Sequence, residues 1–553
     1  MLAKNKKKAV QRLPARSVKK RGQDQRFEVV QIHREIFRRN QSHINAMVES
    51  HNSEFQSYEE RYRQHTKTYL EKSSIDQLEQ ELAQRKLIFF GDYHTLPQAQ
   101  YSFLRFLRRV PKERPLTLAL EWLEARHQKH LDAYLDGEMT LEKLLEFLSE
   151  QNSVIQTQRK TMANVLEHAK VSGHKVIGIE RSRNRNRRYS LHVRDKFAAR
   201  IIAREIKRHP KNQLWVFVGE MHITPAHLPH EIQALLPNIE ENDSFTSIYQ
   251  NADEIYWDLE SKGQEHDTEI VRIEPSQYCI INTLPIVAQQ SFLTWLDTDD
   301  SEQSLVGIEE TFRDYIRYIE RYFDLGIGEA IDKIQVTTVA DLSFLEDLSC
   351  GNDFSSAEIQ TITEQILSSQ SYYIPRIKMA YLGNLSINHA AEEATHFIRH
   401  QCSGSNEPKR LVDAFYARTL EEAIGFMGSK LLNHKRKCLH DPDLEKLRRS
   451  RYSTPFEKEL ARLSFKHTRF ETGKRVKAIA ELYEVDAKMF NALTHTLGYQ
   501  LGDKLFYGLM NGVFAKQNIR VLFFDHFEEE NSALETYFYL SEQAKHISIP
   551  ERL

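Results

Sequence analysis

Short apolar runs that alternate with helical segments set the strongest limit on how this chain can fold. Each run is brief, and most of them end in glycine or an acid. Such runs are typical of strands that are buried on both faces of a parallel sheet. The four runs are LIFF (87–90), LTLALEW (116–122), HKVIGIE (174–180) and LWVFVGE (214–220). Because helix-periodic segments lie between them, the pattern predicts an α/β fold with a mainly parallel sheet and flanking helices.

The rest of the chain has mostly helical periodicity. Residues 27–86 and the residues after about 290 repeat apolar side chains at helical spacing. Further short strands are expected at 244–250 and 277–284, and a late one at IRVLFFDHF (519–527). We therefore predict a basic disordered arm at 1–26, an α/β domain at 27–290 with an N-terminal helical segment, and a mainly helical C-terminal domain at 291–553.

The composition favours a folded protein of a reducing compartment. Of 553 residues, 40% are hydrophobic and 28% charged, and the formal net charge of -2 gives no reason to expect specific nucleic-acid binding. None of the four cysteines pairs at C-x-x-C spacing, which argues against a disulfide scaffold. There is no run of about 18 apolar residues and no apolar signal-peptide core. We therefore expect a cytoplasmic protein without a transmembrane segment.

Two of the apolar runs end in the same local pattern. LIFFGDYHTLP (87–97) and LWVFVGEMHITP (214–225) each give glycine, an acid, one further residue and histidine, with proline three residues later. Glycine lets the backbone leave the strand sharply, and proline stiffens the exit. Because ligands bind beyond the carboxyl ends of parallel strands, we expect the two turns to face a shared site.

Every predicted strand of this group ends at an acid. The four acids are Asp92, Glu121, Glu180 and Glu220. Carboxylates and imidazoles gathered at one edge perturb one another's pKa values unless something neutralises them, and a divalent metal does this. The predicted ligands of Mn, Fe, Co or Zn are Asp92, His94 and His222. Glu121, Glu180 and Glu220 are the predicted catalytic residues, one of them as the general base. For any one acid alone, the alternative is a helix cap or turn residue.

An arginine-rich stretch, RSRNRNRRYSLHVRD (181–195), follows the third strand. Arginine binds carboxylates and phosphates in a fork, so the stretch could hold haem propionates, phosphates or sugar acids. A solvated basic loop is the alternative. We predict Arg181 and Arg194 as cofactor-binding residues, together with Tyr93 of the first turn, whereas Asp195 fits a helix N-cap.

From about residue 85 to 285, these motifs resemble the ChaN-like haem-binding uptake family of the Tiki superfamily. The matching features are the GDYH turn with Gln100 downstream, ALEW with Glu121, RDKFAARI, and VGEMHITPAHLP. The resemblance implies either haem binding linked to iron uptake, as in ChaN-like proteins, or hydrolysis, as in Tiki metalloproteases and erythromycin esterase-like hydrolases. It makes His94, Glu121, Glu180 and His222 the candidates for direct metal contact. Asp92 stands where the family more often has glutamate, and no tyrosine here can be matched to a haem ligand.

The C-terminal half carries weaker motifs. NHAAEEATHFIRH (388–400) places His389, Glu393 and His396 on one helical face, with the E-x-x-H spacing of di-iron bundles. That architecture needs carboxylates on other helices, so a polar interhelical network is the favoured interpretation. HKRKCLH (434–440) offers His434, Cys438 and His440 but no fourth zinc ligand. Glycines one helical turn apart in LGYQLGDKLFYGLMNG favour close helix packing.

The leading hypothesis is a ChaN-like protein whose sheet edge carries an acid- and His-rich pocket for metal-dependent hydrolysis. Two alternatives stay open: a haem-binding or haem-trafficking protein without turnover, and an interaction scaffold with a decayed site. The expected partner is a small molecule or haem, and assembly into a homo-oligomer is compatible with the helical half.

Overall fold

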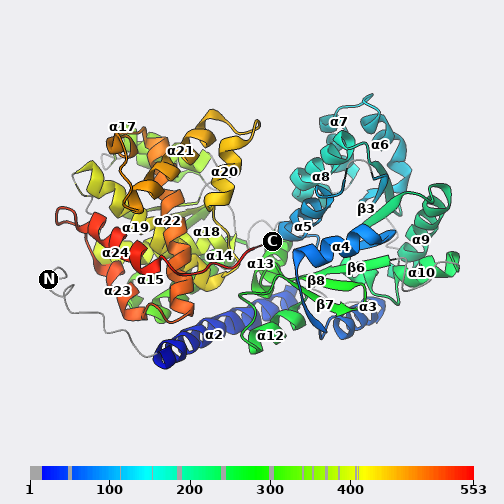
Figure 1. Cartoon of the computed structure of the whole chain (residues 1–553), viewed down its shortest axis with the longest axis horizontal. Coiled ribbons are helices and arrows are strands. Elements are labelled where there is room, and N and C mark those ends of the chain that lie inside the picture. Colours follow the sequence, from blue (N-terminus) through cyan, green and yellow to red (C-terminus); the bar gives the residue numbers. More distant parts are fainter. Residues whose placement is uncertain are drawn as a thin grey trace. The chain divides into compact units, whose positions relative to one another are not determined.

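An eight-stranded sheet forms in the first half of the chain in the computed structural model (Figure 1), with the strand order β1-β7-β8-β6-β2-β5-β3-β4. All pairings from β8 to β4 are parallel, whereas β7 pairs antiparallel with β1 and β8. The mainly parallel α/β sheet predicted from the sequence is therefore confirmed. The strands are β1 (Glu71–Ser73), β2 (Leu87–Asp92), β3 (Leu116–Glu124), β4 (Lys175–Glu180), β5 (Gln213–Gly219), β6 (Phe245–Gln250), β7 (Ile270–Glu274) and β8 (Gln277–Ile280).

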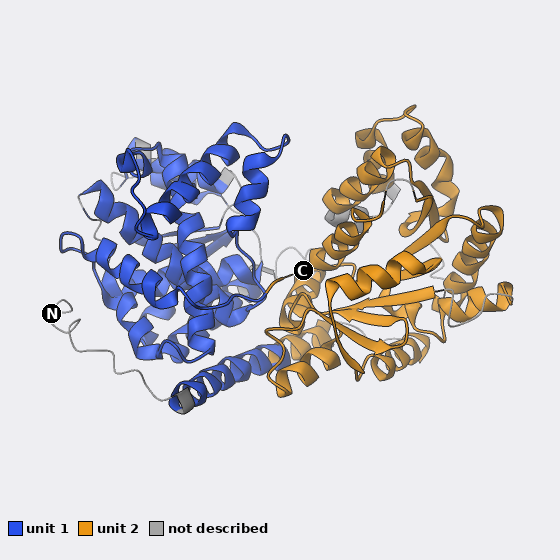
Figure 2. Ribbon diagram, viewed as in Figure 1, with its two compact units in different colours: residues 1–38, 297–550 blue, residues 39–296, 551–553 orange. Residues whose placement is uncertain are grey.

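Two compact units divide the chain (Figure 2). The α/β unit comprises residues 39–296 and 551–553, and the helical unit comprises residues up to Arg38 and 297–550. The structure describes residues 15–47, 53–111, 114–151, 153–182, 190–237, 245–297, 304–338, 342–350, 354–367, 371–383, 386–404, 408 and 410–552. The helical unit includes residues from both halves of the chain, and most of the α/β unit lies between them in the sequence. Contiguous ranges such as 27–290 and 291–553 do not describe this arrangement.

The central strands of the sheet are buried along their whole length, because their apolar runs have no polar face. Every residue of β2, β3 and β5 is buried. Aromatic rings fill the space beside them: Phe103 stacks on Phe217 with a centroid separation of 4.3 Å, and Trp122 meets Phe217 edge-on at 5.0 Å. This packing fixes where the strands end and so positions the turns that follow β2 and β5.

In the sequence of the α/β unit, helices lie between most of these strands. They are α3 (Ser53–His65), α4 (Ile75–Gln84), α5 (Pro97–Leu107), α6 (Gln128–Leu135), α7 (Leu141–Gln151), α8 (Ser153–Val171), α9 (Leu191–Arg208), α10 (Leu228–Leu235), α12 (Asp253–Ser261) and α13 (Pro285–Asp297). Short 3-10 turns follow β3 at Ala125–His127 and β5 at Glu220–Ile223. The second turn carries the Glu-Met-His of the repeated pattern.

The helical unit contains one small sheet beside its helices. Its strands β9 (Gln335–Thr338), β10 (Tyr372–Ile374) and β11 (Met379–Leu382) pair in the order β10-β11-β9. The helices are α14 (Ser304–Phe323), α15 (Gly328–Ile331), α16 (Phe344–Cys350), α17 (Ser356–Leu367), α18 (Ile387–Ser403), α19 (Leu411–Leu432), α20 (Asp441–Arg449), α21 (Pro455–Glu471), α22 (Ala487–Met510), α23 (Lys516–Phe524) and α24 (Ser532–Ala544), with 3-10 turns at Pro375–Ile377 and Ile479–Leu482. The C-terminal region is helical, as predicted.

Two local expectations differ from the structure. The late strand predicted at 519–527 is wrong, because α23 covers most of that run and buries Ile519, Leu522 and Phe523 at helical spacing. Of the arm expected to be disordered at 1–26, residues 15–26 belong to the helix α2 (Ala15–Met47), whereas residues 1–14 lie outside the described part of the chain. This helix is stabilised because apolar side chains such as Ile32 and Ile36 are buried further along it.

The glycines of α22 allow α19 to approach closely, as the sequence indicated. A Cβ atom on Gly498 would lie 2.7 Å from the carbonyl oxygen of Thr419, and one on Gly502 would clash with the carbonyl of Ala423. Among the residues that the structure describes, no helix is both long enough and apolar enough to cross a bilayer.

Candidate functional site

The two repeated turns lie side by side, because β2 and β5 are direct parallel neighbours. Asp92, the last residue of β2, is paired with Gly219, the last residue of β5. His94 and His222 therefore leave adjacent strands at the same sheet edge. Glu121 reaches this edge from β3, the strand on the other side of β5, and its Oε2 accepts a 2.6 Å hydrogen bond from the Gly219 backbone N–H.

His94 is held by a carboxylate through one ring nitrogen. Its Nδ1 donates to Asp92 Oδ2 over 2.8 Å, and the Trp122 indole N–H donates to the same oxygen over 3.0 Å. Burial lowers the pKa of His94, but the carboxylates of Asp92 and Glu121 together bring it to about 9. The side chain is nonetheless 46% exposed, so solvent weakens this coupling. The hydrogen bond to Asp92 fixes the ring and directs Nε2 to the side opposite this carboxylate.

His222 has the same arrangement in a buried setting. Its Nδ1 donates to Asp195 Oδ1 over 2.5 Å, and Tyr58 donates to the other Asp195 oxygen over 2.9 Å. Burial lowers the pKa of His222, but the carboxylates of Asp195 and Glu121 together raise it above its usual value. Only 6% of the His222 side chain is exposed, so it is much less accessible to a ligand than His94.

Both histidines approach one point beside Gly219. A Cβ atom built on Gly219 would lie 3.4 Å from His94 Nε2 and 3.5 Å from His222 Cδ2 and Glu121 Oε2. The two Nε2 atoms each lie 3.9 Å from a carboxylate oxygen of Glu121. A side chain at Gly219 would therefore contact both imidazoles and the Glu121 carboxylate.

Arg194 neutralises two of the predicted catalytic carboxylates. Its guanidinium bonds Glu121 Oε1 and forms a fork to Glu180 at 2.6 and 3.2 Å. Burial opposes ionisation of Glu121, but Arg194 and then the two imidazoles lower its pKa to about 2. A metal ion was expected to neutralise these carboxylates. Arg194 thus supplies part of the positive charge that they need. Arg194, predicted to hold a cofactor, contacts these carboxylates.

Glu220 makes its hydrogen bonds to other groups. Its Oε2 accepts from the Tyr62 hydroxyl over 2.6 Å, and its Oε1 accepts from the Gln250 backbone N–H. Gly91 is required beside it, because a Cβ there would lie 2.8 Å from Glu220 Cγ. Burial raises the pKa of Glu220 to about 8, against the effect of its two hydrogen-bond donors.

The two other predicted cofactor-binding residues, Tyr93 and Arg181, directly follow Asp92 of β2 and Glu180 of β4. Tyr93 is half-buried between Asp92 and His94, and burial raises the pKa of its phenol well above the usual range. The Arg181 guanidinium lies 6.0 Å from the centre of the Phe197 ring. Residues 183–189, which carry the other arginines of the predicted clamp except Arg194, lie outside the described residues.

The metal-ligand set predicted from the sequence stays a prediction. Asp92 bonds Nδ1 of His94, so the geometry gives it the role of positioning that ring. Within the described ranges, two groups place three metal-ligating atoms within 4.8 Å of one another, and both belong to the helical unit. They are Glu392, His396 and Glu422, and Cys438, His440 and Asp503.

Several residues of this edge were missed by the sequence analysis. Asp195 was assigned to a helix cap, but Ser190 caps α9 and Asp195 orients His222. Tyr58 and Tyr62, four residues apart on α3, were not considered. Their spacing on one helical face was a usable signal, although nothing in the sequence connects that face to the strands after it.

The comparisons with known proteins concern the first part of this site. Residues 78–190 match the model of a family described as haem-binding uptake, Tiki superfamily, ChaN, which confirms the resemblance seen in the motifs. The matched segment includes Asp92, His94, Glu121 and Glu180 and ends before His222. Among solved structures, the chain is similar to one titled "Cofacial heme binding to ChaN of Campylobacter jejuni", with 14% identity, a TM-score of 0.26, and coverage of 38% of this chain and 92% of that one. None of the curated proteins compared with the chain matched it.

Proposed function

Given that residues 78–190 match the ChaN family model, we propose that the α/β unit binds haem, with His94 as the residue that would hold its iron. The observation that carries the proposal is the geometry of His94. Its Nδ1 is committed to Asp92, its Nε2 lies next to the side-chain-free Gly219, and nearly half of its side chain faces solvent. When bound, haem would supply an iron that accepts the imidazole lone pair.

Asp92 supports this role by setting the tautomer. A carboxylate that accepts from Nδ1–H fixes the ring so that Nε2, which would give up its proton when iron binds, becomes the donor atom, and it makes the imidazole a stronger donor. Trp122 holds the same Asp92 oxygen, so the carboxylate itself is fixed. His222 has an equivalent carboxylate but is 6% exposed, and a large planar ligand has less access to it. Arg181 is the cation that we assign to the haem propionates.

Metal-dependent hydrolysis is the second candidate, and two observations favour it. Each Nε2 atom lies 3.9 Å from a carboxylate oxygen of Glu121, and imidazole with carboxylate is a donor set that suits Mn, Fe, Co or Zn. In addition, Asp92 Oδ1 is buried and accepts no hydrogen bond from the described residues. The description of the matched family names haem and gives hydrolysis no support, so we rank haem first.

A haem titration of the purified full-length chain tests the proposal. We expect a shifted Soret band that saturates at one haem per chain, and an affinity loss of at least 10-fold in His94→Ala. His209→Ala is the matched control, because His209 is 45% exposed and lies 3.8 Å from the carboxylate of Glu205. It should bind haem as the unaltered protein does.

The outcomes separate the two candidates. Haem affinity that is unchanged in His94→Ala, or lost in Tyr93→Phe instead, would overturn the assignment of His94. A colourless protein that retains Mn, Fe, Co or Zn by elemental analysis and hydrolyses model esters would favour the second candidate. Binding of neither haem nor metal would favour an interaction scaffold.

A further inference from the structure

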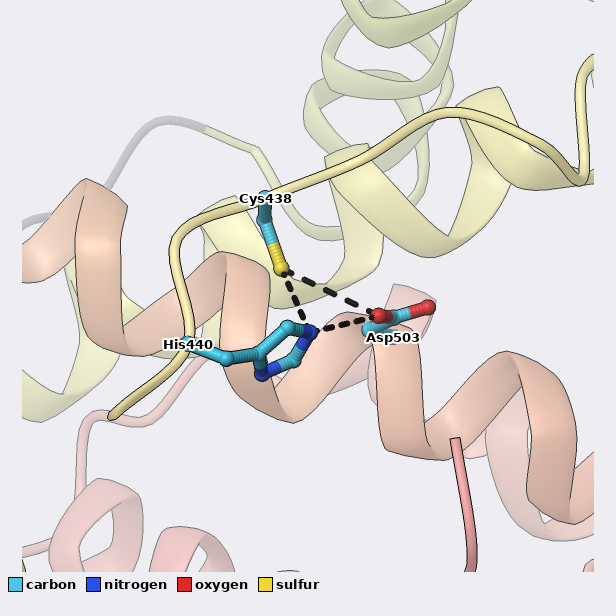
Figure 3. Close-up of side chains that lie close together, drawn as sticks. All are labelled: Cys438, His440 and Asp503. Carbon is cyan, nitrogen blue, oxygen red and sulfur yellow. Dashed lines mark hydrogen bonds and ion pairs between the residues drawn. The ribbon is translucent and has the colours of Figure 1, made fainter. Parts of the chain in front are cut away.

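Three side chains of different chemistry converge in the helical unit, far from the haem site in the sequence. Cys438 and His440 lie on the segment between α19 and α20, and Asp503 comes from α22 (Figure 3). Cys438 Sγ is 3.4 Å from His440 Nε2 and 3.8 Å from Asp503 Oδ2, and His440 Nε2 is 3.0 Å from the same Asp503 oxygen.

These separations are those of ligands around a small metal ion. Bonds of about 2.0–2.3 Å to N, O and S, arranged as a tetrahedron, place the ligand atoms about 3.4–3.6 Å apart. The observed separations of 3.0–3.8 Å require shifts of only a few tenths of an ångström. Sulfur, imidazole and one carboxylate oxygen together are a donor set that suits Zn²⁺ far better than Ca²⁺ or Mg²⁺.

A nucleophilic cysteine dyad or triad is a poorer explanation. In such a relay the cysteine and the acid contact opposite nitrogens of the histidine ring. Here both contacts end on the same atom, His440 Nε2, as Figure 3 shows. Convergence of all three groups on one point is the geometry of coordination and not of a proton relay.

The surrounding residues hold two of these donors in place. Lys430 pairs with the other Asp503 oxygen, Oδ1, over 2.5 Å and donates to the Arg436 carbonyl over 3.1 Å. Arg436 is buried and bonds Glu392 over 2.7 Å and Tyr499 over 2.9 Å, which fixes the backbone two residues before Cys438. Lys430 thus leaves Asp503 Oδ2 facing the cysteine and histidine, as a supporting residue of a metal site does.

In the second such group of the helical unit, residues outside the group bond the carboxylates. Both oxygens of Glu392 are already used, one by Tyr499 and the other by Arg436. Glu422 is paired with Arg418 at 2.5 Å. This group therefore fits the polar interhelical network expected from the sequence. In the Cys438 group, by contrast, Asp503 Oδ2 contacts the other two members of the group.

We propose that Cys438, His440 and Asp503 form a three-residue site for Zn²⁺ or a similar divalent transition-metal ion. Binding displaces two protons: the thiol proton leaves to solvent as a metal–sulfur bond forms, and the His440 Nε2 proton that bonds Asp503 moves to solvent or to Nδ1 as a metal–nitrogen bond forms. The His440 side chain is 31% exposed whereas Asp503 is 4% exposed, so the fourth coordination position faces water or an external ligand. His434, the other histidine of the sequence motif, instead lies with its ring centroid 5.9 Å from that of His33.

Cobalt substitution of the reduced full-length protein tests this site. We expect one Co²⁺ per chain, a thiolate-to-cobalt charge-transfer band in the near ultraviolet, and intense visible bands of tetrahedral cobalt. Zn²⁺ should displace the cobalt and abolish both signals. Cys438→Ser should remove the charge-transfer band and weaken binding at least 100-fold, and Asp503→Asn should weaken it at least 10-fold.

The control is Cys402→Ser, because Cys402 is a free, partly buried thiol of the same unit. It should leave the cobalt spectrum unchanged. Absence of a charge-transfer band in the unaltered protein would overturn the proposal without any variant, as would a band that survives in Cys438→Ser. Protection of the Cys438 thiol from alkylation by added Zn²⁺ gives a second readout, and equal alkylation with and without Zn²⁺ would contradict the site.

Discussion

The sheet edge of the α/β unit and the Cys438 group of the helical unit use similar side chains in different ways. At the sheet edge, Asp92 and Asp195 bind Nδ1 of the two histidines, and Arg194 binds the glutamates. In the Cys438 group, every donor faces one point around His440 Nε2. An abundance of acids and histidines therefore does not make a metal site by itself. What distinguishes the two regions is which ring nitrogen the carboxylate contacts.

The largest expected effect comes from removing a carboxylate that is buried with its histidine. Asp195→Ala leaves His222 and Tyr58 without their hydrogen-bond partner. Removing one partner of a buried ion pair costs about 3–5 kcal/mol of unfolding free energy, because the other group stays buried without compensation. Urea unfolding measures this loss. Asp258→Ala is the control, because its ion pair with Lys262 is at the surface and should cost less than about 1 kcal/mol. Equal losses in the two variants would contradict a structural role for Asp195.

A cross-test of the two ligand sites should show independence. We expect Cys438→Ser to lower cobalt affinity at least 100-fold and to leave haem affinity unchanged. His94→Ala should lower haem affinity at least 10-fold and leave the cobalt spectrum unchanged. The measurement is a pair of optical titrations on each variant. Loss of both ligands in one variant would show that the two regions do not act separately.

Glu220 gives a pH-dependent difference of intermediate size. Its folded-state pKa of about 8 lies above the unfolded value, so the folded state loses stability as pH rises from about 4.5 towards 8. A neutral amide in its place avoids this penalty: its oxygen can accept from the Gln250 N–H, and its NH₂ group can donate to the Tyr62 hydroxyl oxygen. We expect the stability advantage of Glu220→Gln over the unaltered protein to grow by about 2–3 kcal/mol between pH 5 and pH 8.5, because local rearrangement relieves part of the full shift. A difference that stays constant with pH would show that Glu220 titrates normally.

The smallest effect on stability is expected at Gly219. Its φ of -51° suits alanine, and the added Cβ would touch His94, Glu121 and His222 at 3.4–3.5 Å. Gly219→Ala should change the unfolding free energy by about 1 kcal/mol or less and weaken haem binding about 10-fold. Gly91→Ala is the comparison, because its Cβ would lie 2.8 Å from Glu220 and should cost more stability. Unchanged haem affinity in Gly219→Ala would remove Gly219 from the ligand site.

The sequence predicted what depends on local pattern. The strands β2, β3, β4 and β5 were predicted because burial on both faces makes them mostly apolar runs without an alternating polar face, and the repeated turns placed His94 near His222. Partners from distant helices could not be found in this way. Asp503 is 63 residues from His440, and Asp195 reaches His222 from another helix. The run at 519–527 was mistaken for a strand because a short apolar stretch suits either structure until its neighbours are known.

The helix α2 has a consequence for the order in which the chain is made. Its residues up to Arg38 belong to the helical unit, where His33 bonds the Leu431 carbonyl over 2.8 Å and Gln25 bonds the Phe514 carbonyl over 3.2 Å. During translation this segment leaves the ribosome long before those partners exist. The intervening residues 39–296 contain a complete core and can fold in the meantime. The nascent helical unit must therefore wait for the last part of the chain.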